Sequence, residues 1–230
     1  MAEDARLLEA VGAGAPPVLR FYRWARPTIS LGYAQDAAAA VDAAAAERLG
    51  VDVVRRPTGG KAVVHDDELT YAVVVPAGLL PGDVRRSYAL LAEGLVSGLR
   101  ALGVDARCHD GSEPPGASAL CFVAPSWHEI TLDGRKLVGS AQCRRGGAVL
   151  QHGAIPFSWR PERWWAALRH PPGETPATFL ARAASLEATA APARVNALVR
   201  ELGQALGRVL GVEFAPGVDV EEGAAVDGAS

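Results

Sequence analysis

The sequence predicts an α+β fold, with a mixed, largely antiparallel sheet flanked by helices. Residues 128–157 alternate apolar and polar side chains around Asp133-Gly134, a strong two-residue hairpin signal, and a second turn at 144–147 makes a three-stranded meander. Apolar residues recur every three or four positions over 84–102 and 194–210, the pattern of amphipathic helices. Strands joined by hairpins and helices at the flanks together favour this class over a helical bundle.

The first third of the chain predicts short helices and strands in alternation. The Ala-rich stretch is expected to form one helix because alanine has the highest helix propensity, and Gly50 is expected to end it. Pro27 separates the first two strands. In chain order we expect a helix over 2–11, strands over 18–22 and 28–33, a helix over 36–49, and strands over 51–55 and 69–75.

The rest of the chain supplies a loop, a short helix and a tail. Residues 111–117 are rich in Pro and Gly and predict a loop, whereas Trp164 and Trp165 are expected to pack on a short helix. We expect a single domain over 1–216. The acidic, small-residue segment 217–230 is expected to be a disordered tail.

Composition excludes several classes of protein. The 230 residues carry 23 basic and 26 acidic side chains, a formal net charge of −3 at pH 7, which argues against a general nucleic-acid binder. No apolar run approaches the length that crosses a bilayer, and the acidic start of the chain lacks the order of a signal peptide. Three cysteines do not make a disulfide framework. We therefore expect a cytoplasmic protein with free thiols.

The first candidate site is the segment RRPTGGKAVVHD over 55–66. Its paired glycines allow the backbone to turn sharply and approach a ligand, and the flanking basic residues suit a carboxylate or phosphate. The alternative is an ordinary turn with solvated charges. His65 is followed by three carboxylates, but this spacing matches no usual ligand set, so no metal is expected.

Two further residues have reactive side chains in unusual surroundings. Cys121 follows the Pro- and Gly-rich loop and is either a nucleophile or a small buried apolar residue. Lys136 lies in an apolar strand and either faces solvent at a sheet edge or points inward, where burial changes its proton affinity. Gly139 and Ser140 leave room beside it for a ligand.

Four motifs in order resemble the lipoate-protein ligase and octanoyltransferase superfamily, which shares its fold with biotin protein ligases and class II aminoacyl-tRNA synthetase cores. They are SLGYAQ over 30–35, RRPTGGKAVVHD over 55–66, GRKLVGSAQ over 134–142 and QHG over 151–153. The resemblance runs from about residue 20 to 157. Because several motifs occur in the right order, it is far more specific than a single glycine-rich loop.

Within the superfamily the chain looks most like the cysteine-dependent octanoyltransferases. Two motifs support this resemblance: ELTY over 68–71 and CFVAPS over 121–126. In that subfamily the cysteine at the position of Cys121 carries the acyl group and the lysine at the position of Lys136 is its partner. The chain departs from the pattern at His128, where tyrosine is frequent, and at Ala154, where serine is common.

The resemblance implies an acyltransferase of lipoate biosynthesis and protein lipoylation. The enzyme would move an octanoyl group from acyl carrier protein, through a thioester on Cys121, to a lysine of a lipoyl-accepting domain such as the glycine cleavage H protein or a dehydrogenase E2 domain. No cofactor is expected, because the thioester already holds the acyl group in activated form. An ATP-dependent lipoate-protein ligase is the first alternative, and a non-catalytic acyl-carrier-binding protein is the second.

The chemistry assigns expectations to individual residues. A nearby ammonium stabilises a thiolate, so Lys136 is expected to activate Cys121 and to move protons during transfer. Basic residues at 55, 56, 61, 135, 144 and 145 are expected to gather at the mouth of the site and attract acidic carrier domains. The alternative is that they are solvated charges on turns. The substrate pocket is expected to be lined by Arg56, Thr58, Gly59, Gly60, Ala62, Val63, His65, Val138, Gly139, Ser140, Ala141, His152 and Gly153.

Overall fold

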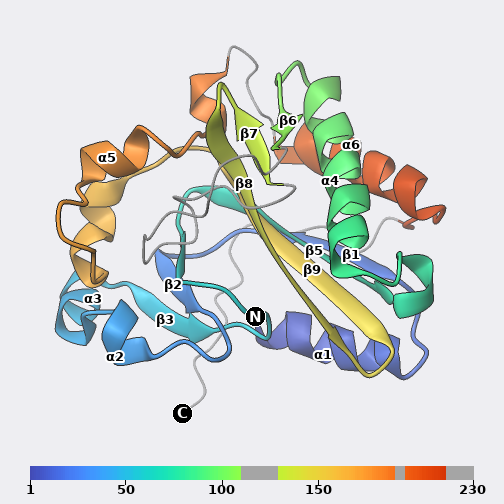
Figure 1. Cartoon of the computed structure of the whole chain (residues 1–230), viewed down its shortest axis with the longest axis horizontal. Coiled ribbons are helices and arrows are strands. Elements are labelled where there is room, and N and C mark those ends of the chain that lie inside the picture. Colours follow the sequence, from blue (N-terminus) through green and yellow to red (C-terminus); the bar gives the residue numbers. More distant parts are fainter. Residues whose placement is uncertain (110–128, 190–194, 216–230) are drawn as a thin grey trace.

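A large antiparallel sheet is the centre of the computed structural model, which describes residues 1–109, 129–189 and 195–215 (Figure 1). Each of its neighbouring strands pairs antiparallel. In spatial order its strands are β1 (Val18–Tyr22), β5 (Glu68–Pro76), β9 (Ala148–Pro156), β8 (Arg135–Arg145), β7 (Ile130–Leu132) and β6 (Arg107–Cys108). With helices at its flanks, the predicted α+β class is confirmed.

A second, smaller sheet lies beside the first. It consists of β3 (Asp52–Arg55), β2 (Thr28–Leu31) and β4 (Val63–His65), with β2 parallel to β3 and antiparallel to β4. The large sheet is the largely antiparallel sheet that the sequence predicts, and the parallel pair of β2 and β3 in the small sheet makes the strand pairing mixed. Strand β4 was not predicted, because the glycines before it gave the segment the appearance of a loop.

The predicted meander is confirmed. Asp133 and Gly134 both have positive φ, 51° and 73°, as the tight turn between β7 and β8 requires. Gly146 and Gly147 do the same between β8 and β9, with φ of 56° and 81°. These turns set the register in which β8 lies between β7 and β9.

Both faces of the large sheet are covered, because alternate residues of a strand point to opposite faces. On β5, Ala72 and Val74 pack against the N-terminal helix α1 (Ala2–Gly12). Tyr71 and Val73 point the other way, into the main core under α4 (Val84–Ala101) and α6 (Val195–Leu210).

The two long helices of the main core pack very closely. A Cβ added at Gly98 of α4 would lie 2.9 Å from the Cα of Leu202 on α6. At Gly94 it would lie 3.0 Å from a methyl group of Leu206. Both helices were predicted from their apolar periodicity, and both are confirmed within one residue at each end.

The prediction of one helix over 36–49 is wrong. The stretch forms α2 (Ala37–Ala40) and α3 (Ala43–Leu49), separated by Val41, which is extended and bridges to Leu168. The Asp42 carboxylate then accepts a hydrogen bond from the N–H of Ala45 at 3.0 Å and caps α3. Tertiary pairing and a new cap outweigh alanine propensity here.

The remaining described segments are short. Turns of 3-10 helix span Ala77–Leu79, Pro161–Arg163, Trp165–Ala167 and Leu186–Ala188, and α5 covers Pro176–Leu180. The expected loop at 111–117 and the expected tail at 217–230 lie outside the described residues. None of the helices described is both long and apolar enough to span a bilayer.

Candidate functional site

A pocket lies between the small sheet and the large one. It holds about 390 Å³ of empty space, counting the part open to solvent. Its lining comes from β2, β4, β5, β8 and β9 and from the start of the chain. The lining residues are Met1, Ser30, Arg56, Val63, His65, Thr70, Lys136, Gly139, Ser140, Ala141, His152, Gly153 and Ala154.

Most residues expected at the site line this one pocket. Eight of the expected substrate-contacting residues do so, and Lys136 lies among them. The eight are Arg56, Val63, His65, Gly139, Ser140, Ala141, His152 and Gly153. The predicted nucleophile Cys121 lies outside the described residues.

The other expected residues lie behind the pocket wall. Val138 packs in the main core under α4 and α6 and does not line the pocket. Ala62 packs in the core beneath the small sheet. Thr58, Gly59 and Gly60 do not line the pocket either and belong to the loop that shapes it.

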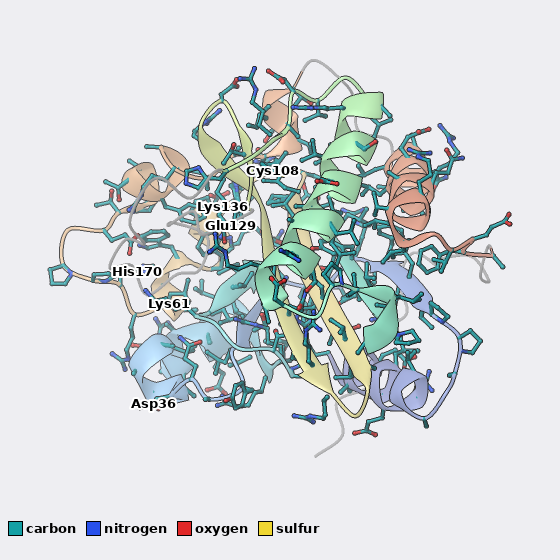
Figure 2. All side chains as sticks on the ribbon, turned by 45° about the vertical axis from the view of Figure 1, so that its right-hand side comes forward. Asp36, Lys61, Cys108, Glu129, Lys136 and His170 are labelled. Atoms are coloured by element: carbon teal, nitrogen blue, oxygen red, sulfur yellow. The ribbon has the colours of Figure 1, made fainter. Side chains whose placement is uncertain are left out.

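Lys136 is a buried cation at the pocket. Its side chain is 1% exposed and forms a short ion pair with the Glu129 carboxylate, itself 5% exposed (Figure 2). Its backbone is held from the other side, since its N–H donates to Arg182 O at 2.9 Å and its carbonyl accepts from Ala184 N at 2.7 Å. A buried ammonium compensated by a carboxylate is a costly arrangement, which makes Lys136 a candidate functional residue.

Polar side chains of the pocket wall bind one another. The Ser30 hydroxyl lies 2.7 Å from Nε2 of His65, and Nδ1 of His65 lies 2.7 Å from Oε1 of Glu68. Thr70 donates to the same carboxylate oxygen at 2.6 Å, and the Trp24 ring stacks on His65 with centroids 4.4 Å apart. With these polar atoms engaged, the wall presents mainly carbon to the cavity.

His152 has a similar environment. Its Nδ1 lies 3.0 Å from Asp4 Oδ2 and its Nε2 lies 2.7 Å from the Thr58 hydroxyl. Burial lowers the pKa of His152, against the opposing effect of the Asp4 carboxylate, so the imidazole is neutral near pH 7. Asp4 also accepts from Arg20 at 2.8 Å and from Tyr22 at 2.9 Å.

Ser140 is held in the same way. Its hydroxyl lies 2.7 Å from the hydroxyl of Tyr71, to which Gln151 also donates at 3.2 Å. Burial raises the pKa of Tyr71 to about 12, so this hydroxyl stays protonated. A Cβ added at Gly153 would lie 2.5 Å from the carbonyl oxygen of Gly139, so glycine is required for the two strands to close this part of the wall.

The expected basic patch is only partly available. Arg56 is 3% exposed, and Nη1 of Arg55 donates to the carbonyls of Gly32, Tyr33 and Gln35. Arg144 donates to Pro81 O at 2.9 Å. These side chains hold backbone in place, and the expectation that they attract carrier domains at the surface is wrong for Arg56.

Neither described cysteine is an activated thiol. Cys108 is exposed on β6 and Cys143 is half-buried on β8, and burial raises the pKa of both. Neither lines the pocket. In the described ranges, no group of three or more His, Cys, Asp or Glu side chains is arranged to hold a metal ion.

Sequence reasoning missed the acidic partners of the site. Asp4 precedes its partner His152 by 148 positions, and no local pattern connects them. Glu129 precedes Lys136 by seven residues and stands directly before the strand paired with that of Lys136, so a search for a carboxylate across the hairpin would have found it. Ser30 and Glu68 were identified only as members of the SLGYAQ and ELTY motifs, with no role in the site.

Known proteins resemble this chain over most of its length. The model of the lipoyl protein ligase A/B catalytic domain family matches residues 1–213. Octanoyltransferase LipM of Carboxydothermus hydrogenoformans is 48% identical over 169 residues, which are 73% of this chain and 63% of that protein. Octanoyltransferase LipM of Moorella thermoacetica is 43% identical over 225 residues, 94% of this chain and 82% of that protein.

Solved structures also resemble the fold. A crystal structure of lipoate-protein ligase A bound with ATP superposes with a TM-score of 0.78 at 26% identity, covering 96% of this chain and 83% of the other. A bipartite lipoate protein ligase from Thermoplasma acidophilum, described together with its E2 lipoyl domain, gives 0.76 at 26% identity over 96% and 81%. The chain covers less than two thirds of the length of the Carboxydothermus hydrogenoformans protein. It covers more than two thirds of the length of the Moorella thermoacetica protein and of both solved structures.

Proposed function

The chain belongs to the lipoyl protein ligase A/B catalytic domain family, and from that premise we propose that it is an octanoyltransferase of lipoate biosynthesis. The acyl group passes from a carrier thioester to Cys121 and from Cys121 to a lysine of a lipoyl-accepting protein. The observation that carries this proposal is an apolar-walled pocket with the buried ammonium of Lys136 at its lining.

The pocket suits an unbranched acyl chain. The polar side chains of the pocket wall hydrogen-bond to one another. An apolar ligand in the pocket therefore leaves these groups with their hydrogen-bond partners. Each methylene that leaves water contributes about 0.8 kcal/mol, which is enough to favour a medium-length chain over acetyl. The small residues Gly139, Gly153 and Ala154 leave space for the acyl chain between the two sheets.

In the first chemical step the Cys121 thiolate attacks the carrier thioester. The new sulfur–carbon bond forms as the old one breaks, and the carrier's pantetheine thiolate leaves and takes up a proton. One thioester replaces another, so no further energy source is required. Lys136 is the cation near the reacting carbonyl that stabilises thiolate and developing oxyanion charge.

In the second step the acceptor amine attacks the Cys121 thioester. An amide forms, the cysteine thiolate leaves, and the proton lost by the amine returns to that sulfur. Because an amide is more stable than a thioester, this step drives the transfer forward. Lys136 and Glu129, joined by their ion pair, are suited to pass the proton.

A lipoyl-accepting protein is the partner that family membership implies, and the E2 lipoyl domain of the Thermoplasma neighbour supports it. We propose octanoyl-acyl carrier protein as donor, an H protein or E2 domain as acceptor, and the cytoplasm as the location. Residues 1–216 form the single catalytic domain in this proposal.

The experiment mixes the chain with octanoyl-acyl carrier protein and a lipoyl domain, without ATP. We expect the lipoyl domain to gain one octanoyl group in a bond that resists hydroxylamine, and a lipoyl domain whose acceptor lysine is replaced by arginine to gain none. A parallel reaction with free octanoate and ATP tests the ligase alternative. If the lipoyl domain is modified only in the reaction with octanoate and ATP, the chain is a ligase. If the chain binds the acyl carrier protein but neither reaction modifies the lipoyl domain, the chain is non-catalytic.

A further inference from the structure

Two chains of buried hydrogen bonds converge on the guanidinium of Arg56. One runs from Glu68 on β5 through His65 on β4 to the Ser30 hydroxyl on β2. It then reaches Arg56, whose Nη1 donates to the Ser30 hydroxyl at 3.3 Å. Each of these side chains is less than 6% exposed.

The second chain starts at Asp4 on α1. It passes through His152 on β9 to the hydroxyl of Thr58, which accepts from Nε of Arg56 at 3.2 Å. Its members are also buried, with Asp4 and Thr58 both 0% exposed. Two carboxylate–histidine–hydroxyl relays from different elements thus meet at one arginine.

One assignment of hydrogens gives every polar atom of each relay a partner. An ionised carboxylate only accepts, so Nδ1 of His65 and of His152 carries the hydrogen. Because the Ser30 and Thr58 hydroxyl oxygens accept from Arg56, their own hydrogens point to Nε2 of the two rings. In this assignment Nε2 of each ring accepts, and the two carboxylates select the tautomer with the hydrogen on Nδ1.

Arg56 uses its donors to hold backbone. Nη1 donates to Ser30 O at 2.7 Å, and Nη2 donates to Gly59 O at 2.8 Å and to Lys61 O at 2.7 Å. With the two hydroxyls, all five guanidinium N–H groups are engaged. The glycine loop is packed so tightly beside them that a Cβ at Gly32 would lie 2.0 Å from Gly60 O.

We propose that Asp4 and Glu68 are positioning residues of the acyl pocket, acting through His152–Thr58 and His65–Ser30 to orient Arg56, which in turn fixes the loop over 57–61. The role of the pocket rests on the proposed function, whereas the arrangement of hydrogens does not. Arg56 is itself a positioning residue, because its N–H groups are turned to the protein and only its remaining surface lines the pocket.

The connectivity of Ser30, His65 and Glu68 also resembles a nucleophile triad. The surroundings favour the positioning role instead. The Ser30 hydroxyl is 0% exposed and already accepts from Arg56, and its strand pairs on both sides. A nucleophile would need an oxygen free to attack, whereas the Ser30 oxygen is engaged by Arg56.

The first test observes the histidines directly, without turnover. Nitrogen NMR of ¹⁵N-histidine-labelled chain at neutral pH should give the unprotonated signature at Nε2 and the protonated one at Nδ1 for both rings. Resonances are assigned with His65→Gln and His152→Gln. A protonated Nε2 on either ring overturns the relay that contains it, whatever the enzyme's activity.

The second test uses the hydroxyls, whose loss leaves the reacting groups in place. Ser30→Ala and Thr58→Val should each raise KM for the octanoyl donor about tenfold with a smaller change in kcat, because each leaves an Arg56 donor unpaired. Thr28→Val is the matched control, since Thr28 lies on the same strand and its hydroxyl donates only to the nearby Arg26 carbonyl among the bonds described. It should leave KM unchanged.

The third test asks whether both relays act through the same arginine. In an Arg56→Gln background, adding Ser30→Ala and Thr58→Val should change KM by less than twofold further, whereas independent roles give the full product of the single effects. Should Arg56→Gln fail to fold, the double variant Ser30→Ala/Thr58→Val decides: a combined effect no larger than about that of one supports a shared target. Unchanged KM in both single variants overturns the proposal. Absence of any acyl transfer by the unmodified chain counts only against the proposed function.

Discussion

Acidification probes the buried pair of Asp4 and His152. Burial lowers the pKa of His152 below its ordinary 6.5, so the folded chain keeps this ring neutral while the unfolded chain protonates it. As pH falls below 6.5, the unfolded state binds more protons than the folded one, and stability declines until the folded pKa is reached. The expected slope for one such group is at most about 1.4 kcal/mol per pH unit.

Asp4 contributes in a lower pH window. Burial alone would raise its pKa, but the hydrogen bonds from His152 and Tyr22 and the nearby positive charges lower it below 3.8. Its contribution to stability is therefore complete above 3.8 and is lost only as pH falls below that value. The two titrations can be separated by the pH at which each acts.

The assay is urea unfolding followed by tryptophan fluorescence, from about pH 7 to about pH 5. His152→Asn removes the titrating ring while its amide can still donate to Asp4, and His170→Asn serves as the matched control on a half-buried histidine. Below pH 6.5 the unmodified chain and the control should lose stability more steeply than His152→Asn. Equal slopes in all three would refute the argument that the fold keeps His152 neutral.

Three other predictions concern the ion pair and the glycine loop. Glu129→Gln should lower the free energy of unfolding by about 3 kcal/mol, since it leaves the Lys136 ammonium buried without its carboxylate, and a loss below about 1 kcal/mol in urea unfolding would contradict this. Lys136→Ala should slow acylation by octanoyl-acyl carrier protein about 100-fold or more, and an unchanged rate in rapid-quench assays reduces the lysine to a structural role. Gly32→Ala should lower Tm because its Cβ would lie 2.0 Å from Gly60 O, at a cost of about 2 kcal/mol, whereas Gly78→Ala, which meets open space, should not; equal Tm values would show that the loop relaxes.

The parts of the fold that the sequence predicted are those set by local signals. Asp133-Gly134 favours one turn geometry, and that turn places Lys136 on a strand three residues later. The apolar periodicity of α4 and α6 is strong enough to locate both helices. The glycine-rich motif and the QHG motif identified much of the pocket lining, because those residues belong to contiguous segments.

The parts that it could not predict depend on contacts between distant segments. Val41 breaks a helix that alanine propensity favours, because Leu168 pairs with it across the fold. Asp4 joins the site only once α1 packs beneath the large sheet and brings it to His152. The burial of Arg56 follows from carbonyls of two separate segments, so the residue looked like a surface charge in the sequence.

In the proposed reaction a cysteine of this chain carries the acyl group. Intact-protein mass spectrometry after mixing with octanoyl-acyl carrier protein measures it most directly, with Cys108→Ser and Cys143→Ser as controls for the described thiols. We predict one octanoyl adduct that hydroxylamine removes, present in both controls and absent in Cys121→Ala. An adduct that persists in Cys121→Ala would contradict the account and place the acyl group on another residue.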